Sequence, residues 1–599
     1  MDIPRTTSSD PLDSQTSSKG LWPAKLLRGL LLAFLLDAFV RPTKPSQSSR
    51  TRAISIAGSV LLFVIAGSWL RLVDTYVPEP YLDEVFHIPQ AQTYCAGRFW
   101  DWDDKITTPP GLYLLAALYH KASLFAECTP FALRASNLFA TLLIFPLAAQ
   151  CRQLIEARCA EQKGEQPTPN VSFYSYHTAL NTTFFPVIFF FSALYYTDVV
   201  STFVVLAAYR NHLLRLGSRR PSFLNDILTV VLGVFALFMR QTNVFWVVVY
   251  MGGLEAVHAV LSAKPVAQGF LSTVHDPPLN EAGPEDWVLC LLSLAVAGLR
   301  YPGRVLRQIW PHITILALFV AFVAWNGGVV LGDKSNHVAT VHLAQMLYIW
   351  PLFAFFSAPL FIPSAVSLIT HPLRHFRGSG AGASKLSTPI NAAYTAVTLI
   401  LSLAIIKYNT IIHPFTLADN RHYMFYVFRY TILRSPARRF ALVAAYTLCR
   451  WLVWDTLAGK GATTSPSQIP VQDLSLLDST SSPPSTAPPS TSTAILLFLT
   501  TALSLVTAPL VEPRYFILPW VFYRLLVPAQ KNQAPLPAAG WWGWLGKLGQ
   551  KYDLRLVLET VWFLAVNAGT MYMFLFRGFY WRGEDGGLLD DGRVQRFMW

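Results

Sequence analysis

The residues best suited to chemistry in this sequence are ionisable groups that stand beside long apolar runs. Asp83 and Glu84 are adjacent, and His87 follows one helical turn later, as expected for a carboxylate base held by neighbouring donors. Gln90 lies on the same segment and can contact a substrate. The alternative is an ordinary acidic surface loop. A charge beside hydrocarbon is costly unless it is paired, hydrated or functional, which favours the first interpretation.

A second acidic group follows in the same loop, at Asp101, Asp103 and Asp104. Its Asp-x-Asp spacing is that of metal-dependent sugar transferases, but a single pair of this kind is a weak signal. We interpret these residues as loop surface and predict no metal site.

Four further polar islands can bind an anion or a sugar. Asp198 ends an apolar run, where it either caps the next helix or faces a cavity. Arg240 lies between two apolar runs, where it either snorkels to the membrane surface or binds a phosphate. The cationic candidates for binding a phosphate are Arg240, Lys334, His337, Arg421 and His422. The candidates for contacting other parts of a substrate are Gln90, Asp198, Gln241, Asn243, Asn326, Asp333, Asp419, Asn420 and Arg514.

The elements that must position these residues are membrane helices. The 599 residues are 53% hydrophobic and only 14% charged, and the mean hydropathy is +0.38. Such a composition excludes a soluble protein. Apolar runs of bilayer-spanning length recur along the chain, so we predict an all-α polytopic membrane protein with roughly 12 to 14 transmembrane helices.

Nine apolar runs are clear candidates for spans. They cover 53–73, 131–149, 224–239, 244–261, 313–331, 343–360, 392–406, 494–510 and 557–576. The runs at 108–124 and 515–527 are short or broken by proline, and we expect re-entrant or interfacial segments there. No internal repeat is visible, which disfavours an inverted-repeat transporter.

The net charge of +13 comes from 47 basic and 34 acidic residues. The basic residues cluster beside the apolar runs, as cytosolic retention charges do. This pattern disfavours nucleic acid as a partner. The six cysteines show no metal-ligand spacing and no disulfide framework, although one or two lumenal bridges fit their positions.

Two stretches fall outside the pattern of spans. Residues 465–493 are rich in Ser, Thr and Pro and cannot bury enough apolar surface to fold, so we predict a disordered loop. Residues 1–52 form a polar extension in which 26–40 fits an interfacial helix better than a cleaved signal. With a cytosolic N-terminus, the loop at 74–110 faces the lumen.

The polar islands, taken in order, resemble those of one family. The matching segments are 81–92, 194–198, 240–243, 325–337, 418–423 and 594–599, and they extend across nearly the whole chain. The family is that of the endoplasmic-reticulum dolichyl-phosphoglucose-dependent alpha-1,2-glucosyltransferases, which add the terminal, third glucose to the lipid-linked oligosaccharide for N-glycosylation. The N-terminal extension and the Ser/Thr/Pro insertion depart from the family without touching these segments.

The resemblance implies a GT-C fold, a multispan helical bundle with its active site on the lumenal side. The catalytic transmembrane region is then 53–464, with 74–110 as the first lumenal loop, and 494–599 is a C-terminal transmembrane region and tail. The family's catalytic carboxylate lies in that first loop. We assign it to Asp83, with Glu84 as the alternative and His87 beside them.

The implied reaction is one inversion at the transferred glucose. One base that deprotonates the acceptor hydroxyl is sufficient for it, without a covalent intermediate. The leaving group is a lipid monophosphate that cationic side chains can stabilise, so no cofactor or divalent metal is required. The implied partners are dolichyl-phosphoglucose, the dolichyl-diphosphate-linked oligosaccharide and the lipids of the endoplasmic-reticulum membrane.

Three alternatives remain at this stage. A transporter or flippase of lipid-linked sugars would carry charges at mid-span and repeated halves, whereas the charges here lie at span ends. A non-catalytic membrane regulator would not need such dense polar islands. Another dolichyl-phosphosugar-dependent transferase would differ in its acceptor sugar, which sequence does not reveal.

Overall fold

The apolar runs fold into helices, and in the described part of the chain six helices are long and apolar enough to cross a membrane. The computed structural model describes residues 49–599 except 125, 163, 165–170, 218–221, 263–273, 335–339, 371–386, 460–486, 531–548, 550, 551 and 584. The six helices are α2 (Ser49–Tyr76), α5 (Pro130–Gln162), α12 (Pro302–Asn326), α15 (Ser387–Tyr408), α18 (Pro436–Ala458) and α22 (Leu554–Phe576).

A bent pair and three shorter apolar segments accompany the six. The pair is α13 (Gln345–Phe356) with η2 (Ala358–Phe361) and α14 (Ile362–Thr370), bent by 84°. The shorter segments are α9 (Phe223–Met239), η1 (Phe245–Tyr250) with α10 (Met251–Leu261), and α19 (Thr491–Val506). The described residues form no β-sheet, only isolated β-bridges, which agrees with a helical multi-pass membrane protein. The sequence-based number of 12 to 14 spans stays a prediction.

The centre of the bundle is built from four helices whose residues are mostly buried. They are α6 (Phe173–Phe184), α7 (Pro186–Phe191), α8 (Thr197–Gly217) and α20 (Ile517–Leu526). Aromatic stacking joins α20 to its neighbours, with ring centroids 3.9 Å apart for Trp520 and Phe185, between α6 and α7, and 4.6 Å apart for Phe522 and Trp246 of η1. Such pairs add to the stabilisation that comes from area burial alone. The run at 515–527 is therefore core rather than an interfacial segment.

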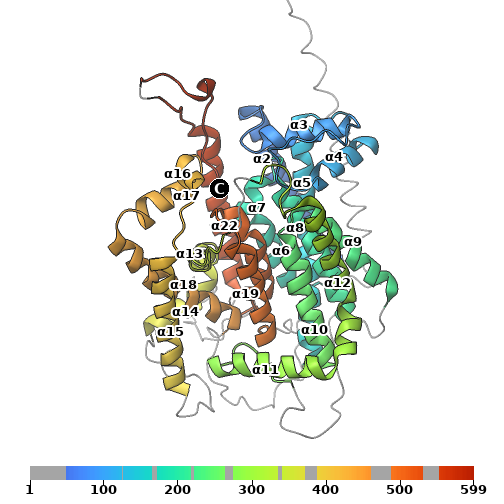
Figure 1. Cartoon of the computed structure of the whole chain (residues 1–599), viewed down its shortest axis with the longest axis vertical. Helices are drawn as coiled ribbons and strands as arrows, with labels where there is room; N and C mark the ends of the chain where they lie inside the picture. The colour runs from blue at the N-terminus through green and yellow to red at the C-terminus, as the bar shows by residue number, and fades with distance from the viewer. Residues whose placement is uncertain are drawn as a thin grey trace, which may run out of the picture. The chain divides into compact units, whose positions relative to one another are not determined.

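Helices also lie across the two ends of the bundle. In Figure 1, α3 (Glu84–Cys95) and α4 (Gly111–Lys121) cross one end, and α11 (Pro284–Arg300) crosses the other. Two small helices, α16 (Pro414–Ala418) and α17 (Tyr423–Val427), lie near the end that carries α3. The π-helical turn η4 (Phe428–Ile432) and the short turns η6 (Pro513–Phe516) and η7 (Asp590–Gly592) complete the set.

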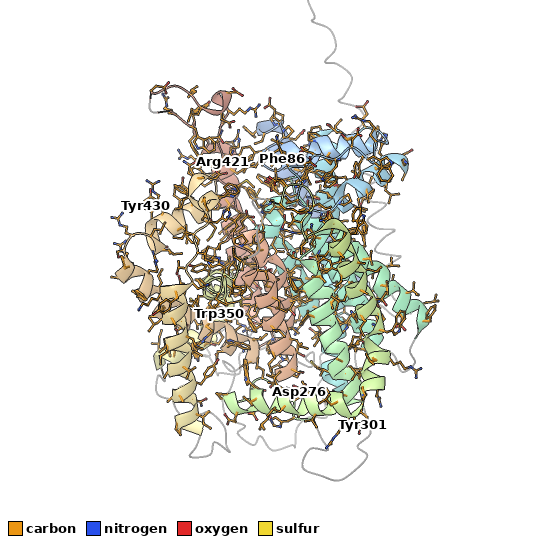
Figure 2. All side chains as sticks on the ribbon, in the orientation of Figure 1. Phe86, Asp276, Tyr301, Trp350, Arg421 and Tyr430 are labelled. Atoms are coloured by element: carbon orange, nitrogen blue, oxygen red, sulfur yellow. A yellow bond between two sulfur atoms is a disulfide. The ribbon has the colours of Figure 1, made fainter. Side chains whose placement is uncertain are left out.

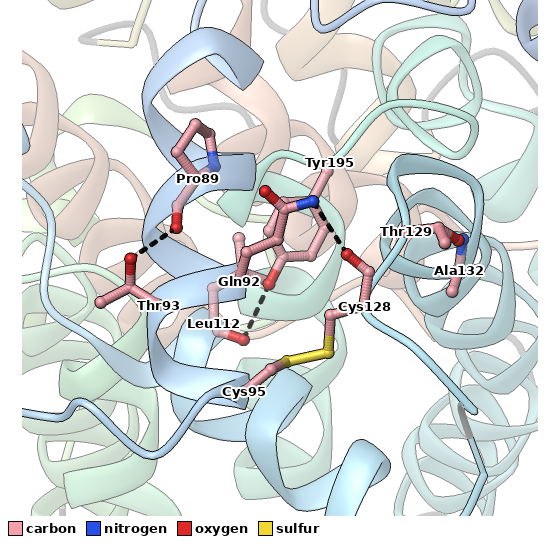
Figure 3. The surroundings of a disulfide bond; sticks show 9 residues. All are labelled: Pro89, Gln92, Thr93, Cys95, Leu112, Cys128, Thr129, Ala132 and Tyr195. Atoms are coloured by element: carbon pink, nitrogen blue, oxygen red, sulfur yellow. Dashed lines mark hydrogen bonds between the residues drawn. A yellow bond between two sulfur atoms is a disulfide. The ribbon is translucent and has the colours of Figure 1, made fainter.

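One disulfide joins Cys95, the last residue of α3, to Cys128 before α5. Figure 3 shows this bond and the neighbouring hydrogen bond from Gln92 Nε2 to Cys128 O, 3.1 Å long. The bridge closes a sequence separation of 33 residues that contains α4, and it restricts the unfolded chain by a loop-closure constraint. It is one of the bridges that the cysteine positions allow.

The structure differs from the predicted spans in three places. The run 343–360 is bent at Ser357 instead of continuing straight. The helix predicted at 313–331 starts earlier, at Pro302, and ends at Asn326, where Gly327 adopts a left-handed φ of +66° that stops the helix. The sequence reading missed α18 because its arginines interrupt the apolar run.

The predicted Ser/Thr/Pro loop at 465–493 overlaps the start of helix α19 (Thr491–Val506) at its C-terminal end. Residues 465–486 lie outside the described residues, but Ser490 is the N-cap of α19, which begins at Thr491 inside the predicted loop. Pro489 O accepts a hydrogen bond from Leu279 N at 3.0 Å, which anchors this end of the segment. Composition alone does not reveal that Ser490 is a helix cap, since Ser and Thr are typical both of loops and of helix starts. The unit Met1–Pro45, and with it the predicted interfacial helix, also lies outside the described residues.

Deleting residues 465–486 and joining the ends with a short Gly/Ser linker should leave the activity of the protein largely intact, because this composition supplies no packed surface. Extending the deletion to residue 493 should lower the yield of folded protein, because it removes the Ser490 cap. Both deletions can be compared by membrane expression level and activity. Equal loss in the two would contradict the interpretation of 465–486 as a dispensable loop.

Candidate active site

Asp83 stands at the start of α3, on the turn that enters the helix. The preceding Leu82 has a φ of +53°, a left-handed conformation that costs energy in a residue with a Cβ. Tyr196 holds this turn, because its hydroxyl accepts from Asp83 N at 3.2 Å and donates to Tyr81 O at 3.3 Å. Strain that is stabilised in this way is frequent at active sites.

Glu84, the neighbouring carboxylate, has a different environment. Its side chain is 0% exposed, and its carboxylate accepts hydrogen bonds from Arg134 Nε at 2.9 Å and Arg134 Nη2 at 2.6 Å. The backbone amides of Tyr195 (2.7 Å) and Tyr81 (3.1 Å) also donate to it. The side chain of Asp83 is 42% exposed. Of the two adjacent carboxylates, only Asp83 is open to a substrate.

Arg514 connects Asp83 to a distant part of the chain. Its Nη1 lies 2.8 Å from Asp83 Oδ2 and 3.9 Å from Asp198 Oδ2. Its Nη2 lies 2.7 Å from Glu512 Oε2. The guanidinium also faces the Tyr196 ring, 5.4 Å from the centroid. The turn η6, whose Arg514 is among the predicted substrate contacts, is thus central to the site.

Asp198 and Arg240 form a second ion pair beside the first. Asp198 lies in the first turn of α8 and is almost fully buried, and its Oδ2 has no hydrogen bond among the described residues. Arg240 follows the last residue of α9 and stacks on the ring of Tyr515, 5.6 Å from its centroid. Arg240 therefore points into the protein rather than snorkelling outward, and Asp198 pairs with it rather than serving as the cap.

The loop between α16 and α17 supplies the third charged group. Both nitrogens of the Arg421 fork donate to Asp419, Nε to Oδ1 at 2.8 Å and Nη2 to Oδ2 at 2.7 Å. The guanidinium stacks on Trp581, 4.6 Å from the ring centroid. Asn420 Oδ1 accepts from Trp581 Nε1 at 2.7 Å. Figure 2 shows Arg421 at the same end of the bundle as Phe86 of α3.

Electrostatics link these groups. Burial opposes ionisation of Asp83, but Arg514, His87 and His422 outweigh it, so the pKa of Asp83 is lowered. Burial also lowers the pKa of His87, against the opposing effect of Asp83. The Nδ1 of His87 is hydrogen-bonded to Tyr113 Oη at 2.6 Å. Asp83 is ionised at neutral pH and can accept a proton.

Several residues that we predict to contact the substrate also form hydrogen bonds within the protein. Gln90 donates to Asp101 O at 2.7 Å and accepts from Asp103 N at 2.9 Å, so it shapes the acidic loop. Gln241 donates to Thr107 O at 2.9 Å. Asn243 is buried and donates to Ser201 Oγ at 2.8 Å.

The island after α12 packs on the first loop. Asp333 N donates to Asp104 O at 2.7 Å, and the intervening turn requires Gly332, whose φ is +62° and where a Cβ would lie 2.2 Å from Asp104 O. Asn326 donates to two carbonyls of its own turn, and Lys334 donates to Asn326 O. Within the described chain, Lys334 forms no hydrogen bond or ion pair with Asp83 or Arg514, and His337 lies outside the described residues.

The acidic loop makes no metal cluster in the part of the chain that the structure describes. Asp101 pairs with Arg98 at the surface, 3.2 Å apart, and Asp103 Oδ1 accepts from Lys105 N at 3.0 Å. These contacts are those of a surface loop.

Sequence analysis missed Arg134, the buried partner of Glu84. The available signal was an arginine near the start of a long apolar helix, which must find a counter-charge or reach water. It also gave Glu512 no role, although Glu512 shares Arg514 with Asp83.

The comparison with known proteins covers a range that includes Asp83, Asp198, Arg240 and Arg514. The model of the DIE2/ALG10 family matches residues 77–525. A protein of Neurospora crassa named "Dol-P-Glc:Glc(2)Man(9)GlcNAc(2)-PP-Dol alpha-1,2-glucosyltransferase" is 47% identical over 96% of this chain and 98% of its own. Proteins with the same name occur in Gibberella zeae, at 45% identity over 99% of this chain and 100% of its own, and in Arabidopsis thaliana, at 29% over 91% and 99%. No solved structure matches significantly.

Proposed function

The chain belongs to the DIE2/ALG10 family, and from this premise we infer that it is an alpha-1,2-glucosyltransferase. It transfers glucose from dolichyl-phosphoglucose to the Glc2Man9GlcNAc2 oligosaccharide on dolichyl diphosphate. The observation that carries this conclusion is that relatives with this activity in their names align over nearly the full length of both chains.

Lipid-linked oligosaccharide profiling tests the assignment directly. Cells that lack this chain should accumulate the diglucosylated oligosaccharide, and reintroducing the chain should restore the triglucosylated one. Accumulation of an earlier intermediate would instead indicate another dolichyl-phosphosugar-dependent transferase.

We propose that the protein resides in the endoplasmic-reticulum membrane with its active site on the lumenal side. Two observations support this. Asp83 begins α3, and the Cys95–Cys128 disulfide ends the same helix. Disulfides persist in the oxidising lumen and are rare on the cytosolic side. The GT-C fold implied by the family resemblance is part of the same proposal.

We propose Asp83 as the base that removes the proton from the acceptor hydroxyl as that oxygen attacks the anomeric carbon. Its carboxylate is ionised and open, whereas the carboxylate of Glu84 is enclosed by Arg134 and two backbone amides. Arg514 orients Asp83 through a 2.8 Å contact. In this mechanism Glu84 has a structural role, and His87 helps to lower the pKa of Asp83.

We propose that Arg514, Arg240 and His422 stabilise the charge that develops on the leaving lipid phosphate. Both arginines lie next to Asp198, and His422 is close enough to lower the pKa of Asp83. Cationic groups placed before the reaction stabilise such charge at no cost of reorganisation. Each arginine already pairs with a carboxylate, so the phosphate must share the arginines with these carboxylates. Arg421, held by Asp419, contributes more distant positive charge.

Arg240→Ala should raise the KM for dolichyl-phosphoglucose more than the KM for the acceptor, because it removes a cation proposed to bind the donor phosphate. Varying each substrate separately in a membrane assay measures the two effects. The amount of folded protein must be followed in parallel, because Asp198 loses its buried partner. A change in protein level with unchanged donor KM would contradict a phosphate-binding role.

Transfer should continue in the presence of EDTA, because side-chain cations can replace a divalent ion at a lipid phosphate. The rate should stay within about twofold of the untreated rate. A strict requirement for Mg²⁺ or Mn²⁺ would move the proposal to the acidic loop at Asp101 and Asp103.

A further inference from the structure

The last residues of the chain pair with a loop of the active site. Residues 595–599, which we call the tail strand, form a parallel bridge in which Met598 pairs with His422. Met598 N donates to Arg421 O at 3.0 Å, and Tyr423 N donates to Met598 O at 3.1 Å. Figure 1 shows the end of the chain, marked C, between α17 and α2.

Arg596 fastens the tail strand to the loop that carries Asp83. The hydroxyl of Tyr81, two residues before Asp83, accepts from Arg596 N at 2.7 Å and donates to Arg596 O at 2.9 Å. Burial raises the pKa of Tyr81 to about 12, so the hydroxyl keeps the proton that it donates. Both hydrogen bonds therefore hold at physiological pH.

The guanidinium of Arg596 also joins the ends of two membrane helices. It donates to carbonyl oxygens in the last turns of α2 and α22, which have no partner within their own helices. The acceptors are Tyr76 O at 3.0 Å, Phe574 O at 2.9 Å and Leu575 O at 2.7 Å. A cation at these carboxyl ends is also favoured by the helix dipoles.

The same strand holds the loop that contains the proposed phosphate-binding groups. His422 Nδ1 is hydrogen-bonded to Trp599 O at 3.1 Å. Arg421 Nη1 donates to Gln595 Oε1 at 3.0 Å. The Trp599 ring packs against Tyr423, with centroids 5.1 Å apart. Five consecutive residues thus contact both the loop of the base and the loop of His422.

We propose that the tail strand, through Arg596 and Tyr81, is a positioning element of the active site that holds the Asp83 loop and the His422 loop at the separation needed for glucose transfer. This inference rests on the proposed function. None of these residues needs to touch the substrate. A displacement of about 1 Å at a reacting group can cost about 100-fold in rate, so an element that fixes two loops can control turnover from a distance.

The test compares three variants of the full-length protein. Tyr81→Phe removes both hydrogen bonds to Arg596 and keeps the ring packed on Phe574, at 5.5 Å between centroids. Arg596→Ala also removes the link to α2 and α22. Arg593→Ala is the matched control, because it removes an exposed arginine of the same tail whose side chain forms no hydrogen bond or ion pair within the described chain.

We expect kcat to fall about 10- to 100-fold in Tyr81→Phe and Arg596→Ala, with the donor KM changed less than threefold. Arg596→Lys should recover part of the kcat, because an ammonium group can reach some of the same carbonyls. Arg593→Ala should match the wild type. Folded protein is measured by fluorescence-detected size exclusion and thermal denaturation.

The pH profile separates positioning from simple loss of structure. Asp83 is surrounded by His87 and Glu84 of α3, Arg514 and Glu512 of η6, Tyr196 and Asp198 at the start of α8, and His422. His422 contributes to lowering the pKa of Asp83. If the tail strand loosens, this contribution weakens and the pKa of Asp83 rises. The acidic limb of kcat should then move to higher pH, since the base must be ionised.

Two outcomes would overturn the proposal. One is wild-type kcat in both Tyr81→Phe and Arg596→Ala. The other is a loss of activity that matches the loss of folded protein with an unmoved acidic limb, which would make the tail strand a purely structural element. Failure of the proposed function is a distinct result, because the wild type and Arg593→Ala would then also lack glucose transfer.

Discussion

Asp83→Asn should abolish glucose transfer while the protein stays folded and inserted in the membrane. Asparagine keeps the shape of the side chain but cannot accept the proton of the acceptor hydroxyl. Loss of a general base costs on the order of 100- to 10,000-fold in rate. Folding should survive, because Asp83 is 42% exposed and Arg514 keeps Glu512 as a partner. Initial rates with purified protein and both lipid substrates measure the effect.

Asp101→Asn is the matched control for this experiment. It makes the same chemical change in the same segment between α2 and α4, at an exposed residue that pairs with Arg98. It should retain nearly full activity. If Asp83→Asn kept most of its activity and Asp101→Asn lost it, the acidic loop rather than the start of α3 would carry the chemistry, and the mechanism proposed above would fail.

Glu84→Gln should have an equally large effect of a different kind, namely loss of folded protein. The substitution leaves Arg134 as a buried charge without its counter-ion, since both side chains are fully buried. Breaking a buried pair on one side costs about 3 to 5 kcal/mol of stability. A typical domain has only about 5 to 15 kcal/mol in total, so most of the protein should fail quality control. Thermal denaturation and membrane expression levels measure this loss.

The double variant Glu84→Gln with Arg134→Gln supplies the check on this prediction. It removes both charges, so its cost should be clearly smaller than the sum of the two single costs. Glu84→Gln protein that folded normally but failed in turnover would contradict the structural role and would return Glu84 to the list of candidate bases.

The architecture was largely predictable from local patterns. Apolar runs identified α2, α5, α15 and α22 because a segment that crosses lipid must satisfy its backbone within itself, and this requirement is written in consecutive residues. The bend after α13 could not be predicted in this way. The central helices α6, α7 and α8 also escaped this reading, since burial against protein tolerates polar residues that lipid does not, as the buried Asp198 and Asn211 of α8 illustrate.

For the site, too, the sequence predicts some features and only the structure shows others. Residue types and their order predict functional roles for Asp83, Arg240, Arg421, His422 and Arg514. The structure brings Asp83 together with Arg514, which lies 431 residues away in the sequence. The same reasoning predicts substrate contacts for Gln90, Asn243 and Asn326, which stays a prediction, and the structure shows that each also donates a hydrogen bond within the protein. An amide can serve either purpose, and its neighbours decide between them.

The sequence by itself determined that this protein is a helical membrane protein, placed it in its family and pointed to two adjacent carboxylates as candidate bases. Only the tertiary structure distinguishes their environments, and this difference supports the proposal of Asp83 as the base. Glu84 points to Arg134 of α5 and is enclosed, whereas Asp83 points to Arg514 of η6 and stays open. Adjacent residues have nearly the same local sequence, so their difference in exposure and counter-ion comes entirely from segments that pack against them from elsewhere in the chain.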